Sequence, residues 1–306
     1  MDAKRKKLLS GNRLFGTHVL NHDLVTTHLI GLCGFDYIWI DMEHTELTKN
    51  QVKELLIALR AGKNDTLKFV RVPKNDPDDV KPILDMGADG IIFPMIRTRQ
   101  DVDKAIAACY YPPEGVRGFS PKAAVNYGFD DMASYIRNSG DKLWKLIQIE
   151  TREAVENLDE ILGNEKVDVF IIGPMDLSGS YGHLGDYHHP EVMAAITSSI
   201  EKIHAAGRVV GVSVGAYDAD TMAFWAKMGV DMISAGTECS FIMDGCKQTL
   251  ENMRNAFLDS CFEGTALGRF FCILYKTVHL CYHSIKITNR RGRYGVVIAW
   301  YFAYCR

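Results

Sequence analysis

Residues 144–176, WKLIQIETREAVENLDEILGNEKVDVFIIGPMD, contain one complete strand–helix–strand pattern. WKLIQIE (144–150) and VDVFIIGPMD (167–176) are nearly continuous apolar runs, as strands buried on both faces of a parallel sheet are. Between them, TREAVENLDEILG begins at Thr151, a residue type that caps helices, and ends at Gly163. This order predicts a parallel sheet that is covered by helices.

The same alternation continues along most of the chain. Six more apolar runs are LFGTHVL (14–20), YIWIDMEH (37–44), LKFVRVP (67–73), GIIFPMI (90–96), RVVGVSV (208–214) and VDMISAGT (230–237). Eight strands alternating with helices predict an α/β fold of the (β/α)8 type, a TIM barrel. An open, doubly wound sheet is the alternative, but neither GxGxxG nor GxxxxGK[ST] follows the first run. A long insert, residues 110–142, separates the fourth and fifth strands.

Composition indicates a globular protein with a packed core. The 306 residues are 47% hydrophobic and 24% charged, with a formal net charge of −3. Nothing in this balance points to nucleic acid or a membrane, and the longest apolar run, residues 295–304, is too short to span a bilayer. The first residues lack the apolar stretch of a signal peptide, and no CxxC pair occurs. We therefore expect a cytoplasmic protein.

The C-terminal end differs from the rest of the chain. Residues 261–306 contain seven Lys/Arg and one acid, a net charge of +6, which leaves −9 on residues 1–260. Their apolar residues follow neither a helical nor an alternating period. We predict a barrel domain over 1–260, followed by an extension over 261–306 that is non-native or disordered. An additional strand pair or partner-binding segment is the alternative.

Polar side chains stand where the predicted strands end. Since these ends lie on one face of a (β/α)8 barrel, they predict a single site, formed by Asp41, Glu43, His44, Arg71, Gln148, Glu150 and Asp176.

Glu150 and Asp176 end neighbouring strands, so their carboxylates can meet at one point. Two carboxylates with positions open to water and substrate suit a hard divalent cation such as Mg²⁺ or Mn²⁺. Backbone N–H groups of Met175 and Asp176, in the GPMD turn, can hold a substrate carboxylate. The alternative for Asp176 is a loop cap.

Arg71 and His44 supply a fixed positive charge and a group that titrates near neutral pH. Arg71 can stabilise a developing oxyanion, and His44 can serve as acid or base. An ion pair of Arg71 with Glu150 or Asp41 inside the barrel is the structural alternative. No lysine ends any of the eight runs, which disfavours Schiff-base chemistry. We expect no ligand role for the histidine pairs His18–His22 and His188–His189.

Several stretches together resemble the HpcH/HpaI aldolase family of metal-dependent pyruvate aldolases. They are GFDYIWIDMEH, VRVP, ILDMGADGIIFPMI, YYPPEGVRG, LIQIET and VFIIGPMDLSGSYGHLGDYHHPEV, within roughly residues 10–258. The resemblance implies a carbon–carbon lyase of the 2-dehydro-3-deoxyglucarate or 4-hydroxy-2-oxoheptanedioate aldolase type. Such an enzyme reversibly cleaves a 4-hydroxy-2-oxo acid to pyruvate and an aldehyde through a metal-stabilised enolate.

The resemblance also implies roles for single residues. Glu150 and Asp176 would bind the cation, Mg²⁺ or Mn²⁺ and possibly Co²⁺. Gln148, Met175, Asp176 and Arg71 would contact the substrate, and Arg71 would stabilise the enolate. His44 would be the base, with Asp41 beside it in the DMEH motif, and Asp85 would raise the basicity of His44; Asp85 enters by resemblance alone. The family implies a homo-oligomer, a trimer or hexamer.

The chain departs from the family pattern in three places: the family's chain ends near residue 260, and two other differences lie within the barrel domain. The loop after YYPPEGVRG reads SPKAAVNYG, with Lys122 as its cation, and the eighth strand ends in Gly236-Thr237-Glu238 where Gly-x-Asp is expected. Two other functions stay open. One is a different enzyme on the same barrel, either a lyase that acts on a CoA thioester or a citrate-forming condensing enzyme, and the other is a barrel that binds a 2-oxo acid without catalysis.

Overall fold

The structure, a computed structural model, describes residues 3–62 and 65–262. The chain divides into two compact units, residues 1–241 and 242–306, and the eight strands found among the described residues belong to the first unit. Residues 263–306 lie outside the described part, so the predicted extension and the boundary at 260 stay predictions.

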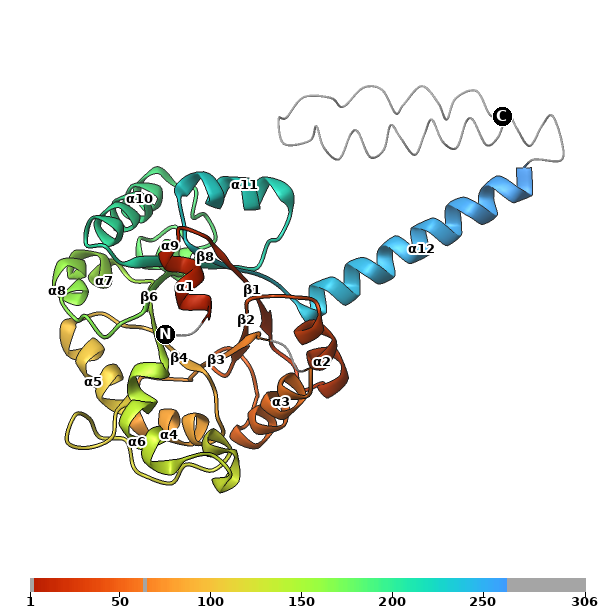
Figure 1. The fold of residues 1–306 in the computed structure, drawn as a ribbon. Helices are drawn as coiled ribbons and strands as arrows, with labels where there is room; N and C mark the ends of the chain where they lie inside the picture. Colours follow the sequence, from red (N-terminus) through yellow and green to blue (C-terminus); the bar gives the residue numbers. More distant parts are fainter. Residues whose placement is uncertain (1–2, 63–64, 263–306) are drawn as a thin grey trace. The chain divides into compact units, whose positions relative to one another are not determined.

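The first unit is a closed parallel barrel in which each strand pairs with the next and β8 pairs with β1 (Figure 1). The predicted (β/α)8 fold is therefore confirmed. All eight apolar runs form strands: β1 Leu14–Val19, β2 Tyr37–Asp41, β3 Leu67–Arg71, β4 Gly90–Phe93, β5 Trp144–Ile149, β6 Val169–Ile172, β7 Val209–Val214 and β8 Met232–Thr237.

Helices alternate with the strands, and most of those in the first unit lie around the barrel (Figure 1). The helices of the described residues are α1 Ala3–Leu9, α2 Leu24–Leu32, α3 Lys49–Ala61, α4 Pro77–Asp85, α5 Arg99–Cys109, η1 Ala123–Gly128, α6 Met132–Lys142, α7 Arg152–Glu156, α8 Leu158–Leu162, α9 Pro174–Ser180, α10 Pro190–Ala205, α11 Ala219–Met228 and α12 Glu238–Phe262. The insert between β4 and β5 is partly helical, since it holds η1 and α6. The helix that begins at Thr151 is divided at Asn157 into α7 and α8.

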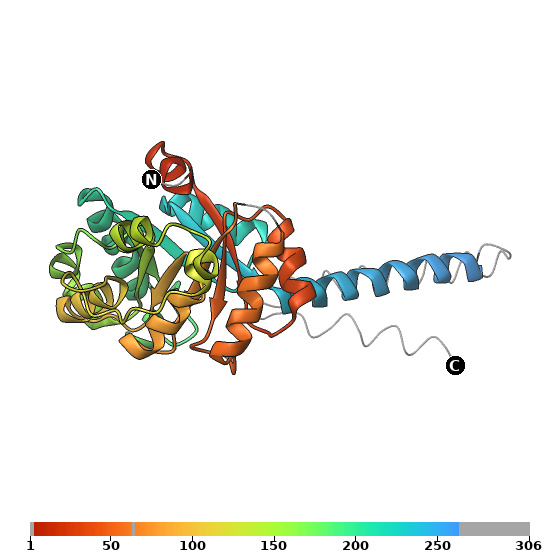
Figure 2. The same cartoon turned by 60° about the horizontal axis from the view of Figure 1, so that its bottom comes forward.

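The short helix α1 lies at the amino-terminal end of the strands (Figure 2). Its Arg5 donates to the carbonyl oxygens of Lys142 and Leu143 at 2.9 and 2.7 Å, just before β5 begins. Lys4 and Lys7 contact Asp36, the residue before β2, each at 2.9 Å or closer. These contacts fix α1 over this end of the barrel and leave the opposite end for the site.

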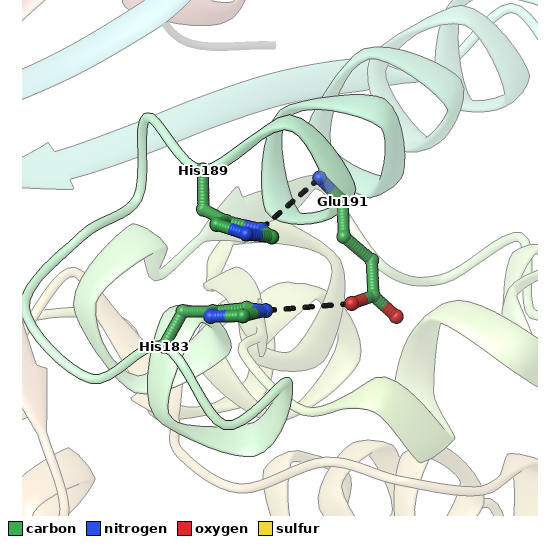
Figure 3. Close-up of side chains that lie close together, drawn as sticks. All are labelled: His183, His189 and Glu191. Carbon is green, nitrogen blue, oxygen red and sulfur yellow. Dashed lines mark hydrogen bonds and ion pairs between the residues drawn. The ribbon is translucent and has the colours of Figure 1, made fainter.

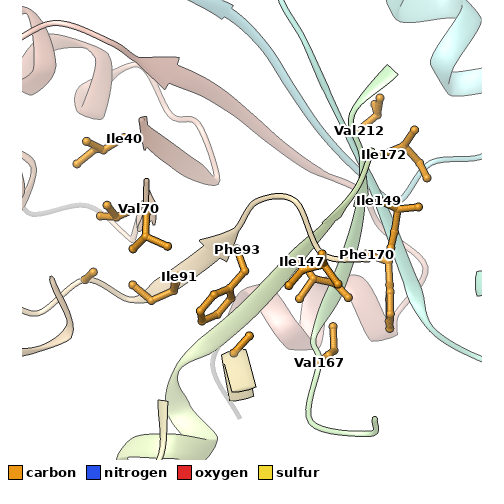
Figure 4. Close-up of a cluster of buried hydrophobic side chains, with 14 of the residues drawn as sticks. Ile40, Val70, Ile91, Phe93, Ile147, Ile149, Val167, Phe170, Ile172 and Val212 are labelled. Atoms are coloured by element: carbon orange, nitrogen blue, oxygen red, sulfur yellow. The ribbon is translucent and has the colours of Figure 1, made fainter. Parts of the chain in front are cut away.

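Two cores follow from the alternation of side chains along each strand. One set of positions faces outward and packs against the helices; Figure 4 draws part of this core, with Ile40, Val70, Ile147 and Phe170 among its residues. The other set fills the barrel interior and is rich in aromatic rings, namely Leu14, Tyr37, Trp39, Phe69, Ile92, Trp144, Leu146, Val169, Ile171 and Met232.

Candidate active site

The site continues the inward-facing rows of side chains at the carboxyl ends of the strands. In β2 the row runs from Trp39 to Asp41, and in β3 from Phe69 to Arg71. In β5 it runs from Leu146 to Gln148 and then to Glu150 just after the strand. Because successive inward positions are two residues apart, the apolar filling of the barrel gives way to polar groups at one level.

Arg71 is the central charge of this level. Asp41 and Arg71 are register partners on β2 and β3, and the carboxylate of Asp41 accepts from Arg71 Nε at 2.8 Å and Nη2 at 2.6 Å. Arg71 Nη1 lies 2.8 Å from Glu43 Oε2 and donates to Gln148 Oε1 at 3.3 Å. The structural alternative for Arg71, an ion pair with Asp41, is thus present. The third nitrogen of Arg71, Nη1, does not take part in this pair and lies beside Gln148 and Glu43.

Glu150 is held by two donors. Gln148 Nε2 donates to Glu150 Oε2 at 2.7 Å, and the backbone N–H of Met95 donates to Oε1 at 2.6 Å. Met95 has φ +54°, in the left-handed region that residues other than glycine seldom adopt. The loop after β4 therefore takes an unusual conformation, and its N–H points at the carboxylate.

The site has an excess of negative charge. Burial, then the nearby charges of Glu43 and Asp176, raise the pKa of Glu150 to about 7 against the opposing Met95 N–H group. Burial likewise raises the pKa of Glu43 to about 7, where Arg71 opposes the rise and Asp41 and Asp176 add to it. For Asp41, burial would raise the pKa, but the hydrogen bonds and charge of Arg71 outweigh it and hold the pKa below its usual value.

This charge balance fits a bound cation. The carboxylates of Asp41, Glu43 and Glu150 lie near one guanidinium, which already pairs with Asp41, and the charge of Asp176 acts on both Glu43 and Glu150. Glu43 Oε2 is buried and, although near Arg71, has no aligned hydrogen bond. A divalent cation would neutralise such a group, and oxygen ligands are those that Mg²⁺ and Mn²⁺ prefer. The donor set thus fits the cation that the sequence predicts.

His44 and Met175 lie at the open side of the site. The side chain of His44 is 62% exposed, and its Nε2 is 3.8 Å from Glu43 Oε2. Met175 is 47% exposed and lies with Asp176 in the first turn of α9, where N–H groups have no carbonyl partner within the helix. The structure thus brings His44, Arg71, Asp41, Gln148, Glu150, Met175 and Asp176 to one end of the barrel.

Asp85 lies elsewhere. It is the last residue of α4, which returns toward the start of β4, and its carboxylate accepts from Arg117 Nη2 at 2.8 Å. Burial raises the pKa of Asp85, although Arg117 opposes the rise. The start of β4 belongs to the amino-terminal end of the barrel, opposite His44. Within one chain the structure does not bring these two residues together.

Three groups shape this region without a specific role predicted from the sequence. Glu43 is one of the predicted strand-end residues of the site, and its Oε2 lies 2.8 Å from Arg71 Nη1 and 3.8 Å from His44 Nε2. The Met95 N–H has no signal in the sequence, because it depends on a backbone angle. Glu238 follows β8 at the position where the family pattern has aspartate. Its carboxylate accepts from the N–H groups of Leu20 and Asn21 at 2.7 and 2.6 Å and so joins the ends of β8 and β1.

None of the eight strands described by the structure ends in a lysine. The two lysines on strands, Lys68 and Lys145, lie near their starts and pair with Asp89 at 2.7 Å and Asp168 at 3.5 Å.

Residues 18–243 match the family described as HpcH/HpaI aldolase/citrate lyase, and this span includes all the site residues. The chain belongs to this family. It is 34% identical over 212 residues to a hydroxypyruvate/pyruvate aldolase of Roseobacter denitrificans, covering 69% of this chain and 82% of the relative. A 5-keto-4-deoxy-D-glucarate aldolase of Shigella dysenteriae is 34% identical over 215 residues, covering 70% of this chain and 82% of the relative.

Solved structures agree with the fold. A HpcH/HpaI aldolase/citrate lyase family protein from Burkholderia cenocepacia superposes with a TM-score of 0.78 at 27% identity, over 83% of this chain and 100% of that one. The resemblance drawn from the sequence motifs is thereby confirmed, and with it the assignment to carbon–carbon lyases of the aldolase type. Among the described residues no helix combines the length and the apolar character needed to cross a membrane.

Proposed function

We propose that this family member is a divalent-metal-dependent aldolase that reversibly cleaves a 4-hydroxy-2-oxo acid to pyruvate and an aldehyde. The observation that carries the proposal is the surplus of carboxylates around Arg71, with Glu150 fixed by Met95 and Gln148. Such a site suits a cation and a chelating oxo acid better than it suits an apolar ligand.

Glu150 and Asp176 would hold the cation, Mg²⁺, Mn²⁺ or Co²⁺. When bound, it would act as a Lewis acid toward the carbonyl oxygen of the substrate. Gln148 Nε2 and the N–H groups of Met175 and Asp176 would orient the oxo acid at its oxygen atoms. Because Asp41 already fixes two of the guanidinium nitrogens, Arg71 presents Nη1 toward the developing negative charge of the enolate.

His44 would move the proton at the open side of the site. In the cleavage direction the base takes the proton of the 4-hydroxyl group, and the C3–C4 bond breaks to give the aldehyde and the enolate of pyruvate. Protonation at C3 then completes pyruvate. The high exposure of His44 suits contact with both the substrate and solvent.

Asp85 can assist His44 only if a second copy of the chain supplies it, because the two residues lie at opposite ends of one barrel. This supports our proposal of a homo-oligomer, a trimer or hexamer. A cytoplasmic location is also proposed, and the free thiols of Cys33, Cys109, Cys239 and Cys246 accord with a reducing compartment.

The test uses the full chain with pyruvate and a panel of hydroxyaldehydes in the presence of Mg²⁺ or Mn²⁺. We expect adduct formation that EDTA and Glu150→Gln abolish and that borohydride leaves unchanged. Inactivation by borohydride would instead indicate an imine and overturn the mechanism.

Deuterium exchange into the methyl group of pyruvate separates catalysis from binding. We expect the wild-type protein with metal to catalyse the exchange and Arg71→Lys to lose it. Pyruvate binding without exchange or adduct would favour the non-catalytic alternative, and turnover of a CoA thioester in its place would favour the lyase alternative.

A further inference from the structure

A second set of metal-ligating side chains lies away from the candidate active site. Ligand atoms of His183, His189 and Glu191 all lie within 4.8 Å of one another, in the loop between α9 and α10 and the first turn of α10 (Figure 3). His183 Nε2 is 3.4 Å from Glu191 Oε2. The rings of His183 and His189 stack with centroids 3.3 Å apart and 17° between their planes. Both rings thus direct an edge toward Glu191.

Part of this arrangement has a structural explanation. His189 is the N-cap of α10, and its Nδ1 accepts from the N–H of Glu191 at 3.3 Å. Arg152 Nη2 pairs with Glu191 Oε1 at 2.6 Å. Neither contact uses Glu191 Oε2, and neither explains why the imidazole of His183 lies beside that oxygen.

We propose that His183, His189 and Glu191 bind a transition-metal ion of the zinc class. Two imidazole nitrogens and one carboxylate oxygen are the ligands that Zn²⁺, Co²⁺, Ni²⁺ and Cu²⁺ accept, whereas Mg²⁺ prefers oxygen alone. Glu191 Oε2 can bind the ion while Oε1 keeps its ion pair with Arg152. The partly exposed cluster leaves positions for water ligands.

Binding requires one change in the loop. A nitrogen ligates in the plane of its ring, so two stacked rings cannot both direct a nitrogen at one ion. At least one ring must turn out of the stack. Both histidines are partly exposed, and Gly182 and Gly185 lie on either side of His183. The ring can therefore turn at a small cost in free energy.

The proposed ion would join the loop to α10, and hydrogen bonds already join the loop to α9. Ser178 of α9 binds the loop through its carbonyl oxygen, which accepts from the His183 N–H at 2.8 Å, and through its Oγ, which accepts from the Gly185 N–H at 3.1 Å. Arg152 follows Glu150 by two residues, and its N–H donates to Ser180 Oγ at 2.9 Å. The cluster is therefore separate from the predicted ligands Glu150 and Asp176 but connected to the segments that hold them.

The test counts zinc ions bound by the full chain in equilibrium dialysis. All measurements are made in the Glu150→Gln background, which removes one predicted ligand of the other cation. We expect this protein to bind one more equivalent of Zn²⁺ than its His183→Asn derivative, even under a large excess of Mg²⁺. Because the comparison needs no turnover, it is independent of whether the chain is an aldolase.

His22→Asn is the matched control, because His22 also pairs with a glutamate, Glu54, at 2.7 Å but is not part of the His183 cluster. It should leave zinc binding unchanged. Glu191→Gln is a second variant in case His183→Asn fails to fold, which circular dichroism reports. Cu²⁺ bound at the cluster should give an electron paramagnetic resonance spectrum with couplings to two imidazole nitrogens. Equal zinc binding by the folded variants and their parent would overturn the proposal.

Discussion

Asp41 and Arg71 form a two-point ion pair between neighbouring strands, with Nε–Oδ1 and Nη2–Oδ2 distances of 2.8 and 2.6 Å. Asp41 is buried and the side chain of Arg71 is 11% exposed, and their Cα atoms are register partners at the last level of β2 and β3. Such a pair restricts the guanidinium to one orientation. Its third nitrogen then points toward Glu43 and Gln148, where the proposed substrate would lie.

Asp41→Asn should lower kcat by roughly 100-fold, because an amide cannot accept from both nitrogens and Arg71 loses its fixed position. The value of kcat/KM should fall equally, since the lost interaction stabilises the transition state alone. Steady-state kinetics with the aldol adduct as substrate measures both. Asp89→Asn removes a comparable ion pair, with Lys68, at the other end of the barrel and should leave kcat unchanged. A wild-type kcat for Asp41→Asn would show that Arg71 needs no such support.

Gly173→Ala should weaken binding of Mn²⁺ by about tenfold or more, in the range seen when groups that orient metal ligands are changed. A Cβ at residue 173 would lie 2.8 Å from Glu150 Oε2 and 2.9 Å from Glu150 Cβ, too close for both to stay in place. Titration calorimetry measures the dissociation constant. Gly215→Ala is the control, because a Cβ there meets no atom within 4 Å and the residue also follows a strand end, that of β7. Unaltered Mn²⁺ affinity in Gly173→Ala would argue against Glu150 as a ligand.

The fold was predictable because its signal is repeated. Each strand is a short apolar run, and on β2, β3 and β5 the inward row ends in a polar residue that can be read from the sequence, namely Asp41, Arg71 and Gln148. The groups that fix the side chains of the site were harder to predict from the sequence. The donor to Glu150 is a backbone N–H that points inward only because Met95 adopts φ +54°. No residue pattern encodes that angle.

Residues that meet through loops give little signal in the sequence. The loop conformation stacks His189 on His183 beside Glu191, and no motif predicts this meeting. His183 and His189 are six residues apart, and His189 and Glu191 are two apart. Together these spacings fit neither one face of a helix nor one face of a strand. Asp85 could come only from resemblance, because its position opposite the site gives it no partner there within one chain.

His18 should make stability depend on pH below neutrality. It is buried in β1 with Nδ1 2.9 Å from the carbonyl oxygen of Gly236 and Nε2 2.9 Å from Ser213 Oγ. Burial, and less strongly the charge of Arg71, lower the pKa of His18 below its usual value, although Gly236 and Asp41 oppose this. Below about pH 6.5, His18 therefore binds a proton in the unfolded chain but stays neutral in the folded chain. The free energy of unfolding then falls as the pH decreases.

Urea unfolding at several pH values between 7.5 and 5 measures this effect. The contribution of His18 to the slope can reach about 1.4 kcal/mol per pH unit for one proton. His18→Gln keeps a donor and an acceptor but cannot titrate, so its free energy of unfolding should change less steeply with pH. Parallel curves for the variant and the wild type would contradict the assignment to His18.

The separation of His44 from Asp85 leads to the last prediction, which concerns assembly. Asp85 ends α4 and pairs with Arg117 at 2.8 Å, while His44 lies at the other end of the barrel. If a second copy supplies Asp85, a His44→Ala subunit and an Asp85→Asn subunit each lack one half of the pair. A mixed oligomer then contains sites in which the intact His44 of one subunit meets the intact Asp85 of the other.

We therefore expect His44→Ala and Asp85→Asn to be weakly active alone and to regain activity when the two are unfolded together and refolded as a mixture. Mixing His44→Ala with Arg71→Lys is the control, because both residues lie at the same end of one barrel. If both residues of a mixture belong to one site within a single chain, every site still lacks one of them, and that mixture gains no activity. A gain confined to the Asp85→Asn mixture places Asp85 across a subunit interface. Its absence, in a refolded oligomer confirmed by sedimentation, would remove Asp85 from the mechanism and leave His44 to act with Glu43 alone.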